Sequence, residues 1–414
     1  MNAMLPPKRD QIDAAASEAA HPEITYDVVI VGGGPSGATA ATDLAGIGRS
    51  VLLLDRAGRI KPCGGAIPPR AIHDFAIPTS LVVARINCAR MVAPSHTGVD
   101  MPIDDGYVGM VDREHFDEWL RERAGQTGAR RVTGTFESFA RDADGTARIH
   151  YRPKGEGAPA SVRARMVIGA DGAISNLARA AMPKSKRPPF VFAYHEIVRA
   201  PAQTNPRYDA KRCEVVYQGR ISPDFYGWVF PHGETASIGT GSANKGFSLK
   251  EAVARLRSDA GFDGAETIRR EGAPIPMKPL RKWDNGRDVL LAGDAAGVVA
   301  PASGEGIYYA MLGGRLAGEA VDLALRTGDA RALATARKRF MADHGRVFWI
   351  LGVLQWIWYR SDRRREQFVK LCRNPDVQKL TWDSYMNKQL VRGKFMAHVR
   401  VFFNDLGHLL GMAR

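Results

Sequence analysis

The sequence predicts an α/β fold with a parallel-sheet domain, an antiparallel-sheet domain inserted into it, and a C-terminal helical region. Three observations predict it. A buried strand, a glycine-rich turn and an alanine-rich helix follow one another in residues 26–45. Strand-like alternation, prolines and aromatic residues gather in residues 183–275. A basic stretch that is rich in aromatic residues fills residues 331–414.

Composition narrows the kind of partner and the compartment. The 414 residues carry a formal net charge of +14, which favours a negatively charged partner. Because no nucleic-acid-binding motif occurs, a membrane surface or a phosphorylated substrate ranks above nucleic acid. The four cysteines show no C-x-x-C spacing, so we expect no metal site and a reducing, cytoplasmic compartment. We expect neither a secretory signal nor a transmembrane helix.

The first strand and helix enclose a turn that suits a dinucleotide. Residues 28–31 are all β-branched, as in a strand buried on both faces. Gly32, Gly34 and Gly37 follow with the G-x-G-x-x-G spacing, and Asp55 ends the next strand, where such units place a ribose-binding carboxylate. The helix N-terminus offers free N–H groups to a pyrophosphate. The turn predicts a bound adenine dinucleotide, which is either FAD or NAD(P).

Two later segments hold residues that could contact this ligand. The loop of residues 59–69, rich in proline and glycine, holds Cys63 on backbone that can approach a ligand closely. The alternative is a plain connecting loop with an inert thiol. A helix begins after Asp112, its expected N-cap. Arg113 lies in its first turn, where a cation opposes the helix dipole, so it either has an anionic partner or is a solvated surface arginine.

Two more turns follow buried strands. Asp171 lies in a G-A-D-G turn, and Asp294 lies in an A-G-D-A turn. After the turn of residues 301–306, a helix of small residues is expected over residues 307–325, and it can pack very closely on another element. Other strands are expected within residues 86–111 and at residues 131–138, 147–152, 164–168 and 288–291.

The inserted sheet contains an aromatic strand, expected over residues 225–231. Its alternation places Tyr226, Trp228 and Phe230 on one face. This face is either an ordinary half-buried sheet face or an apolar wall for a hydrophobic substrate.

The C-terminal region contains an apolar stretch at residues 348–359, which is followed at once by a cluster of arginines. Either the helix packs on the core with a solvated basic edge, or it lies at a membrane interface.

The three turns, in this order, resemble those of the FAD-dependent para-hydroxybenzoate hydroxylase-like flavoproteins. Within that group, the chain is similar to the geranylgeranyl reductase family over roughly residues 25–400. The likeness is carried by Pro62-Cys63-Gly64-Gly65, by Tyr226-x-Trp228-x-Phe230-Pro231 and by residues 304–311, Gly-Glu-Gly-Ile-Tyr-Tyr-Ala-Met. The basic, aromatic C-terminal extension resembles the chlorophyll and bacteriochlorophyll branch.

The resemblance implies a Rossmann-type FAD-binding domain and roles for single residues. Asp55 would hold the adenosine ribose, Asp294 the ribityl chain, and the turn of residues 304–306 would cover the flavin ring. The residues implied in FAD binding are Gly32, Gly34, Pro35, Ser36, Gly37, Asp55, Arg56, Arg113, Asp171, Asp294, Gly304, Gly306 and Ile307. The implied catalytic residues are Cys63, Tyr226 and Trp228, and the substrate-binding residues are Gly64, Gly65, Phe230 and Pro231. NADPH would visit transiently, because no second G-x-G-x-x-G exists.

The implied activity is reduction of isolated C=C bonds of a geranylgeranyl chain to phytyl, on geranylgeranyl-(bacterio)chlorophyll or on geranylgeranyl diphosphate, in (bacterio)chlorophyll biosynthesis. The protein would be peripheral on a photosynthetic membrane. The alternative is an aromatic-hydroxylase-type monooxygenase, which shares the FAD turns. A non-catalytic flavin-binding adaptor and an archaeal-type lipid reductase are weaker alternatives.

The chain is expected to divide into four regions. Residues 1–23 form a disordered N-terminus. Residues 24–87, 106–182 and 276–330 form the FAD-binding domain. Residues 88–105 and 183–275 form the substrate domain, and residues 331–414 form the helical region.

Overall fold

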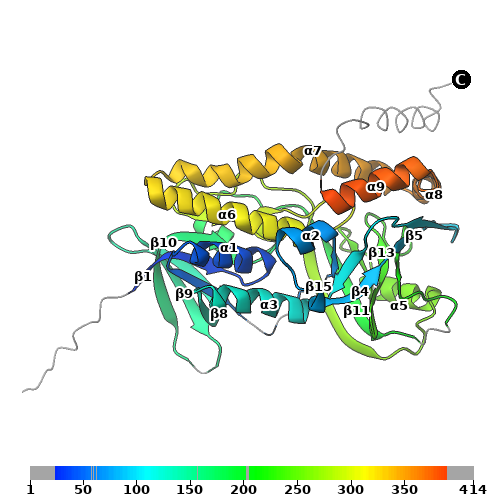
Figure 1. Ribbon diagram of the computed structural model, residues 1–414, viewed down its shortest axis with the longest axis horizontal. Coiled ribbons are helices and arrows are strands. Elements are labelled where there is room, and N and C mark those ends of the chain that lie inside the picture. Colours follow the sequence, from blue (N-terminus) through cyan, green and yellow to red (C-terminus); the bar gives the residue numbers. More distant parts are fainter. Residues whose placement is uncertain are drawn as a thin grey trace, which may run out of the picture.

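In the computed structural model, residues 24–388 are described, apart from residues 57, 59, 62, 156 and 202–204. The disorder expected for residues 1–23 and the end of the helical region, residues 389–414, lie outside the described residues. The predicted fold class is confirmed: a mixed α/β body with a Rossmann-like half, a large sheet that is antiparallel except where β12 pairs in parallel with β5, and C-terminal helices (Figure 1).

The first sheet is parallel around its centre. β1 pairs in parallel with β2 and β10, and β10 pairs in parallel with β16. The antiparallel strand β9 joins the long strands β8 and β10. The strands are β1 (Thr25–Val31), β2 (Val51–Asp55), β8 (Arg130–Arg141), β9 (Ala147–Pro153), β10 (Ala160–Gly169) and β16 (Val289–Leu291). The strands β1, β2 and β16 are almost wholly buried, as their apolar runs predict.

The second sheet has seven strands in the order β15-β11-β14-β13-β12-β5-β6. Its strands are β5 (Cys88–Val92), β6 (Gly98–Pro102), β11 (Phe190–Arg199), β12 (Arg212–Val216), β13 (Gly227–His232), β14 (Thr235–Ser242) and β15 (Thr267–Pro276). A third sheet consists of β3 (Ala66–Ile67), β7 (Val108–Val111) and β4 (Val82–Ile86). The strands expected within residues 86–111 are therefore divided between two sheets. Tyr226 stands just before β13, one residue outside the strand that was expected to contain it.

Nine α-helices lie in the described part of the chain. They are α1 (Pro35–Gly46), α2 (Pro69–Asp74), α3 (Arg113–Gln126), α4 (Asn176–Ala181), α5 (Leu249–Asp259), α6 (Ile307–Thr327), α7 (Ala334–Trp358), α8 (Asp362–Leu371) and α9 (Pro375–Asn387). The Asp112 side chain accepts a hydrogen bond from the Glu114 N–H, so it is the N-cap of α3. None of the helices described is long and apolar enough to cross a membrane.

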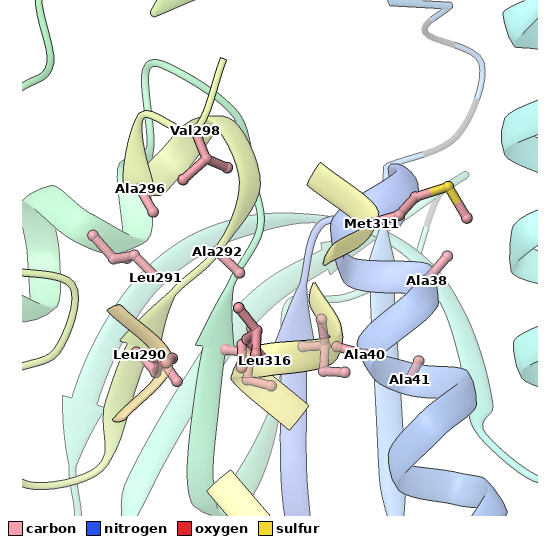
Figure 2. Packing of buried hydrophobic residues seen from close by; sticks show 14 of the residues in the cluster. Ala38, Ala40, Ala41, Leu290, Leu291, Ala292, Ala296, Val298, Met311 and Leu316 are labelled. Carbon is pink, nitrogen blue, oxygen red and sulfur yellow. The ribbon is translucent and has the colours of Figure 1, made fainter. Parts of the chain in front are cut away.

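The main core lies between the first sheet and the helices α1 and α6. Figure 2 shows Ala38, Ala40 and Ala41 of α1 beside Leu316 of α6 and the end of β16. The helices approach so closely that a β-carbon at Gly314 would lie 2.1 Å from the backbone oxygen of Ser36. The close packing predicted for the helix after residue 306 is thus made against α1, while α7 covers the other side of α6 (Figure 1).

The two faces of the seven-stranded sheet carry different elements. Helix α5 packs on β11 and β14, over the face that holds Val229. The opposite face holds Tyr226 and Trp228, and the C-terminal end of α7 covers it together with α8 and α9. This second face therefore lies between the sheet and the C-terminal helices.

Candidate active site

The glycine turn joins β1 to α1 and presents unpaired donors. The Gly33 N–H donates to Asp55 Oδ2 over 2.6 Å, which holds the carboxylate at the turn. The Ser36 hydroxyl, in the first turn of α1, is buried and has no hydrogen-bond partner. A β-carbon at Gly34 would meet no atom within 4 Å, so the space beside the helix N-terminus is open. An orphaned hydroxyl, free helical N–H groups and open space fit the pyrophosphate of FAD.

The turn of Gly293 and Asp294 lies against the same helix start. A β-carbon at Gly293 would lie 2.7 Å from Cβ of Ser36. Asp294 is buried in a short 3-10 helix, and its carboxylate pairs with Lys61. The two predicted turns, which are far apart in sequence, are therefore neighbours in space.

Asp171 stands at the end of β10, where its carboxylate organises the next helix. It accepts hydrogen bonds from the N–H groups of Asn176 and Leu177, at 2.8 and 3.1 Å, in the first turn of α4. Burial raises the pKa of Asp171 against the lowering effect of these bonds. Arg56, which was also predicted to contact the cofactor, lies exposed directly after β2.

Arg113 has its anionic partner within its own helix. Its guanidinium makes two hydrogen bonds to the Asp117 carboxylate, at 2.8 and 2.7 Å, and the side chain is buried. Burial disfavours the charged form, but Asp117 outweighs this effect and the pKa of Arg113 is raised, with Cys63 acting in the same direction. Arg113 is thus not a solvated surface arginine.

The Cys63 loop packs on the aromatic strand. A β-carbon at Gly64 would lie 2.7 Å from the Phe230 ring, so only glycine permits this approach. The half-buried Cys63 sulfur accepts the Gly65 N–H at 3.4 Å. The loop that precedes the three-stranded sheet and the strand β13 of the seven-stranded sheet therefore meet at this point.

Three aromatic rings continue from this contact along one face of the sheet. The ring centroids are 6.4 Å apart for Phe230 and Trp228, and 6.2 Å apart for Trp228 and Tyr226. The Tyr226 hydroxyl donates to the Ser303 carbonyl over 2.6 Å. Burial raises the pKa of Tyr226 far above that of a free tyrosine, so the side chain stays a neutral phenol. Pro231, the next residue along β13, is buried.

The turn before α6 closes this row of rings. A β-carbon at Gly304 would lie 3.1 Å from the Tyr226 hydroxyl oxygen. Gly306 is the N-cap of α6, and Ile307 begins the helix. Helix α7 holds the turn in place, because the Ala302 N–H donates to Gln355 Oε1 at 3.0 Å.

The C-terminal helix α9 brings two residues that sequence reasoning missed. Lys388 forms a buried ion pair with Glu305 in the turn before α6, with Nζ 2.8 Å from Oε2. The same ammonium group lies 4.0 Å from the centre of the Tyr385 ring. Burial lowers the pKa of Lys388, and Glu305 opposes this shift. No local signal in the sequence marks Lys388 or Tyr385. Lys388 lies 83 positions from its partner Glu305, so the pairing depends on the tertiary fold.

Comparison with known proteins agrees with this architecture. An FAD binding domain family matches residues 72–342, and an NAD(P)-binding Rossmann-like domain family matches residues 30–81. A geranylgeranyl bacteriochlorophyll reductase-like protein from Thermoplasma acidophilum has the same fold, with a TM-score of 0.77 at 23% identity over 89% of this chain and 98% of that one.

Two named relatives cover nearly the whole chain. Geranylgeranyl diphosphate reductase of Rhodobacter capsulatus is 56% identical over 387 residues, which is 94% of this chain and 98% of the relative. Geranylgeranyl diphosphate reductase of Synechocystis is 35% identical over 92% of this chain and 97% of the relative. With the dinucleotide turn, the Cys63 loop and the aromatic strand all in place, the chain belongs to the geranylgeranyl reductase family of FAD-dependent oxidoreductases.

Proposed function

We propose that this protein reduces isolated C=C bonds of a geranylgeranyl chain to phytyl, with NADPH as electron source, in (bacterio)chlorophyll biosynthesis. The chain would be carried on a (bacterio)chlorophyll pigment or on a diphosphate. The names of the Rhodobacter capsulatus and Synechocystis relatives support an isoprenoid substrate. One observation carries the proposal: the Cys63 loop, the aromatic strand and the turn before α6 meet around a single row of rings.

The apolar character of this row suits an isoprenoid chain. Such a chain has no polar groups to anchor, so aromatic walls can bind it and still let it move along them. Reduction of several bonds in turn requires the chain to slide along the wall. Trp228 and Phe230 would line that path, with Gly64, Gly65 and Pro231 beside them.

The residues that would hold FAD gather around the N-terminus of α1, where Asp55 accepts the Gly33 N–H and Gly293 lies against Ser36. We assign the pyrophosphate to the N-terminus of α1, the adenosine ribose to Asp55 and the ribityl chain to Asp294. FAD held by these residues would supply the hydride chemistry, with NADPH as the source of electrons. Gly304 and Gly306 would cover the ring. The remaining contacts are proposed for Gly32, Gly34, Pro35, Ser36, Gly37, Arg56, Arg113, Asp171 and Ile307.

Reduction of a C=C bond adds a hydride to one carbon and a proton to the other. An isolated alkene has no carbonyl to polarise it, so hydride alone does not add easily and the site must supply the proton. Cys63 lies in the loop that meets the row of rings at Phe230, and Tyr226 ends the row. Each bears a proton, and the Tyr226 hydroxyl would have to turn from the Ser303 carbonyl to deliver its own. Burial raises the pKa of Tyr226, which keeps its proton in place but makes it the weaker acid. We propose that one of them, or a water molecule that they hold, protonates the alkene.

Product analysis of Cys63→Ala and Tyr226→Phe tests this assignment. We expect the variant that loses the donor to fall by about 100-fold or more in turnover, the usual effect of removing a general acid. The other variant should alter the proportions of geranylgeranyl, dihydro, tetrahydro and phytyl products measured by mass spectrometry. Cys88→Ala and Tyr208→Phe are matched controls, since both side chains lie away from the row of rings.

Unchanged rates and product proportions in both variants would refute the roles of Cys63 and Tyr226. Turnover under strictly anaerobic conditions separates the reductase from the monooxygenase alternative, because only the monooxygenase consumes O₂. Product formation that stops without oxygen would overturn the proposed function itself.

We also propose that the protein is peripheral on the membrane that holds its lipophilic substrate. Trp349 and Trp356 lie seven positions apart on α7 and are 71% and 63% exposed. The Arg360 guanidinium lies 5.0 Å from the centre of the Trp356 ring. Exposed tryptophans beside arginines suit the headgroup region of an anionic bilayer.

A further inference from the structure

A series of buried, hydrogen-bonded polar side chains lies behind the row of rings formed by Tyr226, Trp228 and Phe230. The Trp228 indole N–H donates to the Ser237 hydroxyl oxygen over 3.1 Å. The same oxygen lies 2.9 Å from His195 Nδ1, and His195 Nε2 lies 2.8 Å from Glu271 Oε2. Ser237 has no exposed surface, and His195 is 2% exposed.

One arrangement of hydrogens satisfies every atom of this series. The indole N–H can only donate, so Ser237 accepts from it. A carboxylate can only accept, so His195 Nε2 carries a hydrogen and donates to Glu271. The Ser237 hydroxyl then donates to the lone pair on His195 Nδ1. Each group fixes the orientation of the next, from Glu271 to the indole of Trp228.

These distances resemble those of a Ser-His-acid catalytic triad. Nucleophilic catalysis by Ser237 is excluded, because no substrate can reach its hydroxyl. Ser237 is fully enclosed, and one of its lone pairs is already used by the indole. The series also cannot pass a proton to the row of rings, because an indole N–H does not relay protons. What remains is control of the position of Trp228.

The packing around the indole supports that role. A β-carbon at Gly239 would lie 2.3 Å from Trp228 Cζ2 and 2.5 Å from His195 Cβ. The indole and the imidazole thus fill the space that a side chain at Gly239 would need. With both rings packed and hydrogen-bonded, the indole is held in one orientation.

The series of hydrogen-bonded side chains continues beyond Glu271 to α3, the helix that carries Arg113. Glu271 Oε1 pairs with Arg269 Nε at 2.8 Å, and Arg269 Nη1 pairs with Glu114 in the first turn of α3 at 3.2 Å. The position of Trp228 is therefore tied to the start of α3, an element that packs on α1.

We infer that His195 is a positioning residue, which acts through Ser237 to orient Trp228 and so sets the register of the isoprenoid chain along the wall. The inference rests on the proposed function, in which Trp228 lines the path of that chain. We therefore expect the orientation of the indole to affect which double bond of the isoprenoid is positioned for reduction, and so how many of its double bonds are reduced.

A matched set of variants tests it. Ser237→Ala leaves the indole N–H unpaired. His195→Asn keeps an acceptor near the position of Nδ1, whereas His195→Gln places its amide near Nε2 and loses the bond to Ser237. We expect the fraction of fully reduced product to fall about fivefold in Ser237→Ala and His195→Gln, the effect of one lost hydrogen bond, and to fall less in His195→Asn.

A spectroscopic readout accompanies the product analysis. In protein labelled with ¹⁵N-tryptophan, the indole N–H signal that disappears in Trp228→Phe belongs to Trp228. That signal should move in Ser237→Ala and His195→Gln, and it should stay near its original position in His195→Asn. Equal signals and equal products in Ser237→Ala and the unaltered protein would overturn the inference. If Trp228→Phe itself leaves the products unchanged, the proposed function of Trp228 fails instead.

Discussion

The imidazole of His344 is enclosed by aromatic rings between α6 and α7. Its ring centre lies 5.3 Å from that of Tyr309 and 5.3 Å from that of Phe340. Its Nδ1 atom is buried without a partner. Burial lowers the pKa of His344 to about 4 from an ordinary value of 6.5. At the scale of a residue, the His344 ring therefore makes the free energy of unfolding depend on pH.

The sign of that dependence follows from proton uptake. As the pH falls through 6.5, the unfolded chain protonates His344 while the folded protein does not until about pH 4, so the free energy of unfolding decreases. His344→Phe removes this loss, which is about 2 kcal/mol between about pH 7.5 and pH 5. Urea denaturation at both pH values measures it. His115→Phe, at an exposed position on α3, is the control, and equal pH dependence in His344→Phe and the unaltered protein would contradict the prediction.

At the scale of elements, the end of α9 is fastened to the start of α6 by one buried ion pair. Glu305 accepts the Tyr308 N–H at 3.0 Å as well as pairing with Lys388. Helix α9 also packs its aromatic side chains near Phe230, so it forms part of the wall of the site. The pair therefore couples the C-terminal helices to the turn that borders the row of rings.

Removing one partner leaves a buried charge, whereas removing both leaves none. We expect Lys388→Met and Glu305→Gln each to lower the free energy of unfolding by about 3 kcal/mol or more, and the double variant to lose clearly less than the sum. Lys379→Met is the matched control, because Lys379 pairs with Asp383 on the exposed face of the same helix. Its loss should stay below about 0.5 kcal/mol. A Lys388→Met variant no less stable than Lys379→Met would refute the coupling.

At the scale of the whole molecule, the net charge of +14 and the exposed tryptophans of α7 act together. The opposite side of α7 packs toward the site, since Leu354 and Trp358 belong to the same cluster as Tyr226 and Trp228. The Tyr359 hydroxyl, just after α7, also donates to the Ala302 carbonyl at 2.9 Å. One helix thus carries the proposed membrane face and holds the turn before α6. A lipophilic substrate would have a short route from bilayer to site.

Vesicle sedimentation tests this arrangement. The protein should bind vesicles that contain anionic phosphatidylglycerol and bind pure phosphatidylcholine much less, with added salt weakening the binding. Replacing both Trp349 and Trp356 by serine should reduce binding about tenfold or more, because each ring buries apolar surface at the interface. Ile268→Ser, at an exposed apolar residue on β15, is the control. Equal binding by all three proteins would count against α7 as the membrane face.

Local patterns carried the prediction of the fold class. The β-branched run at residues 28–31 and the glycines after it specify their own backbone shapes, so the parallel strands and the helix α1 were predictable without knowledge of their neighbours. The capping of α3 by Asp112 was predictable for the same reason. The division of residues 86–111 between two sheets was not, because alternation gives a strand its faces but does not choose its partner.

The sequence by itself thus determined the elements whose geometry lies within a few neighbouring residues, and it named Cys63, Tyr226 and Trp228 as candidates for the site. Only the tertiary structure decided that the Cys63 loop touches Phe230, that Lys388 reaches Glu305, and that Ser237 and His195 stand behind Trp228. The physical reason is distance along the chain. These contacts join segments that meet only after sheets and helices have packed, and no local propensity encodes where two such segments meet.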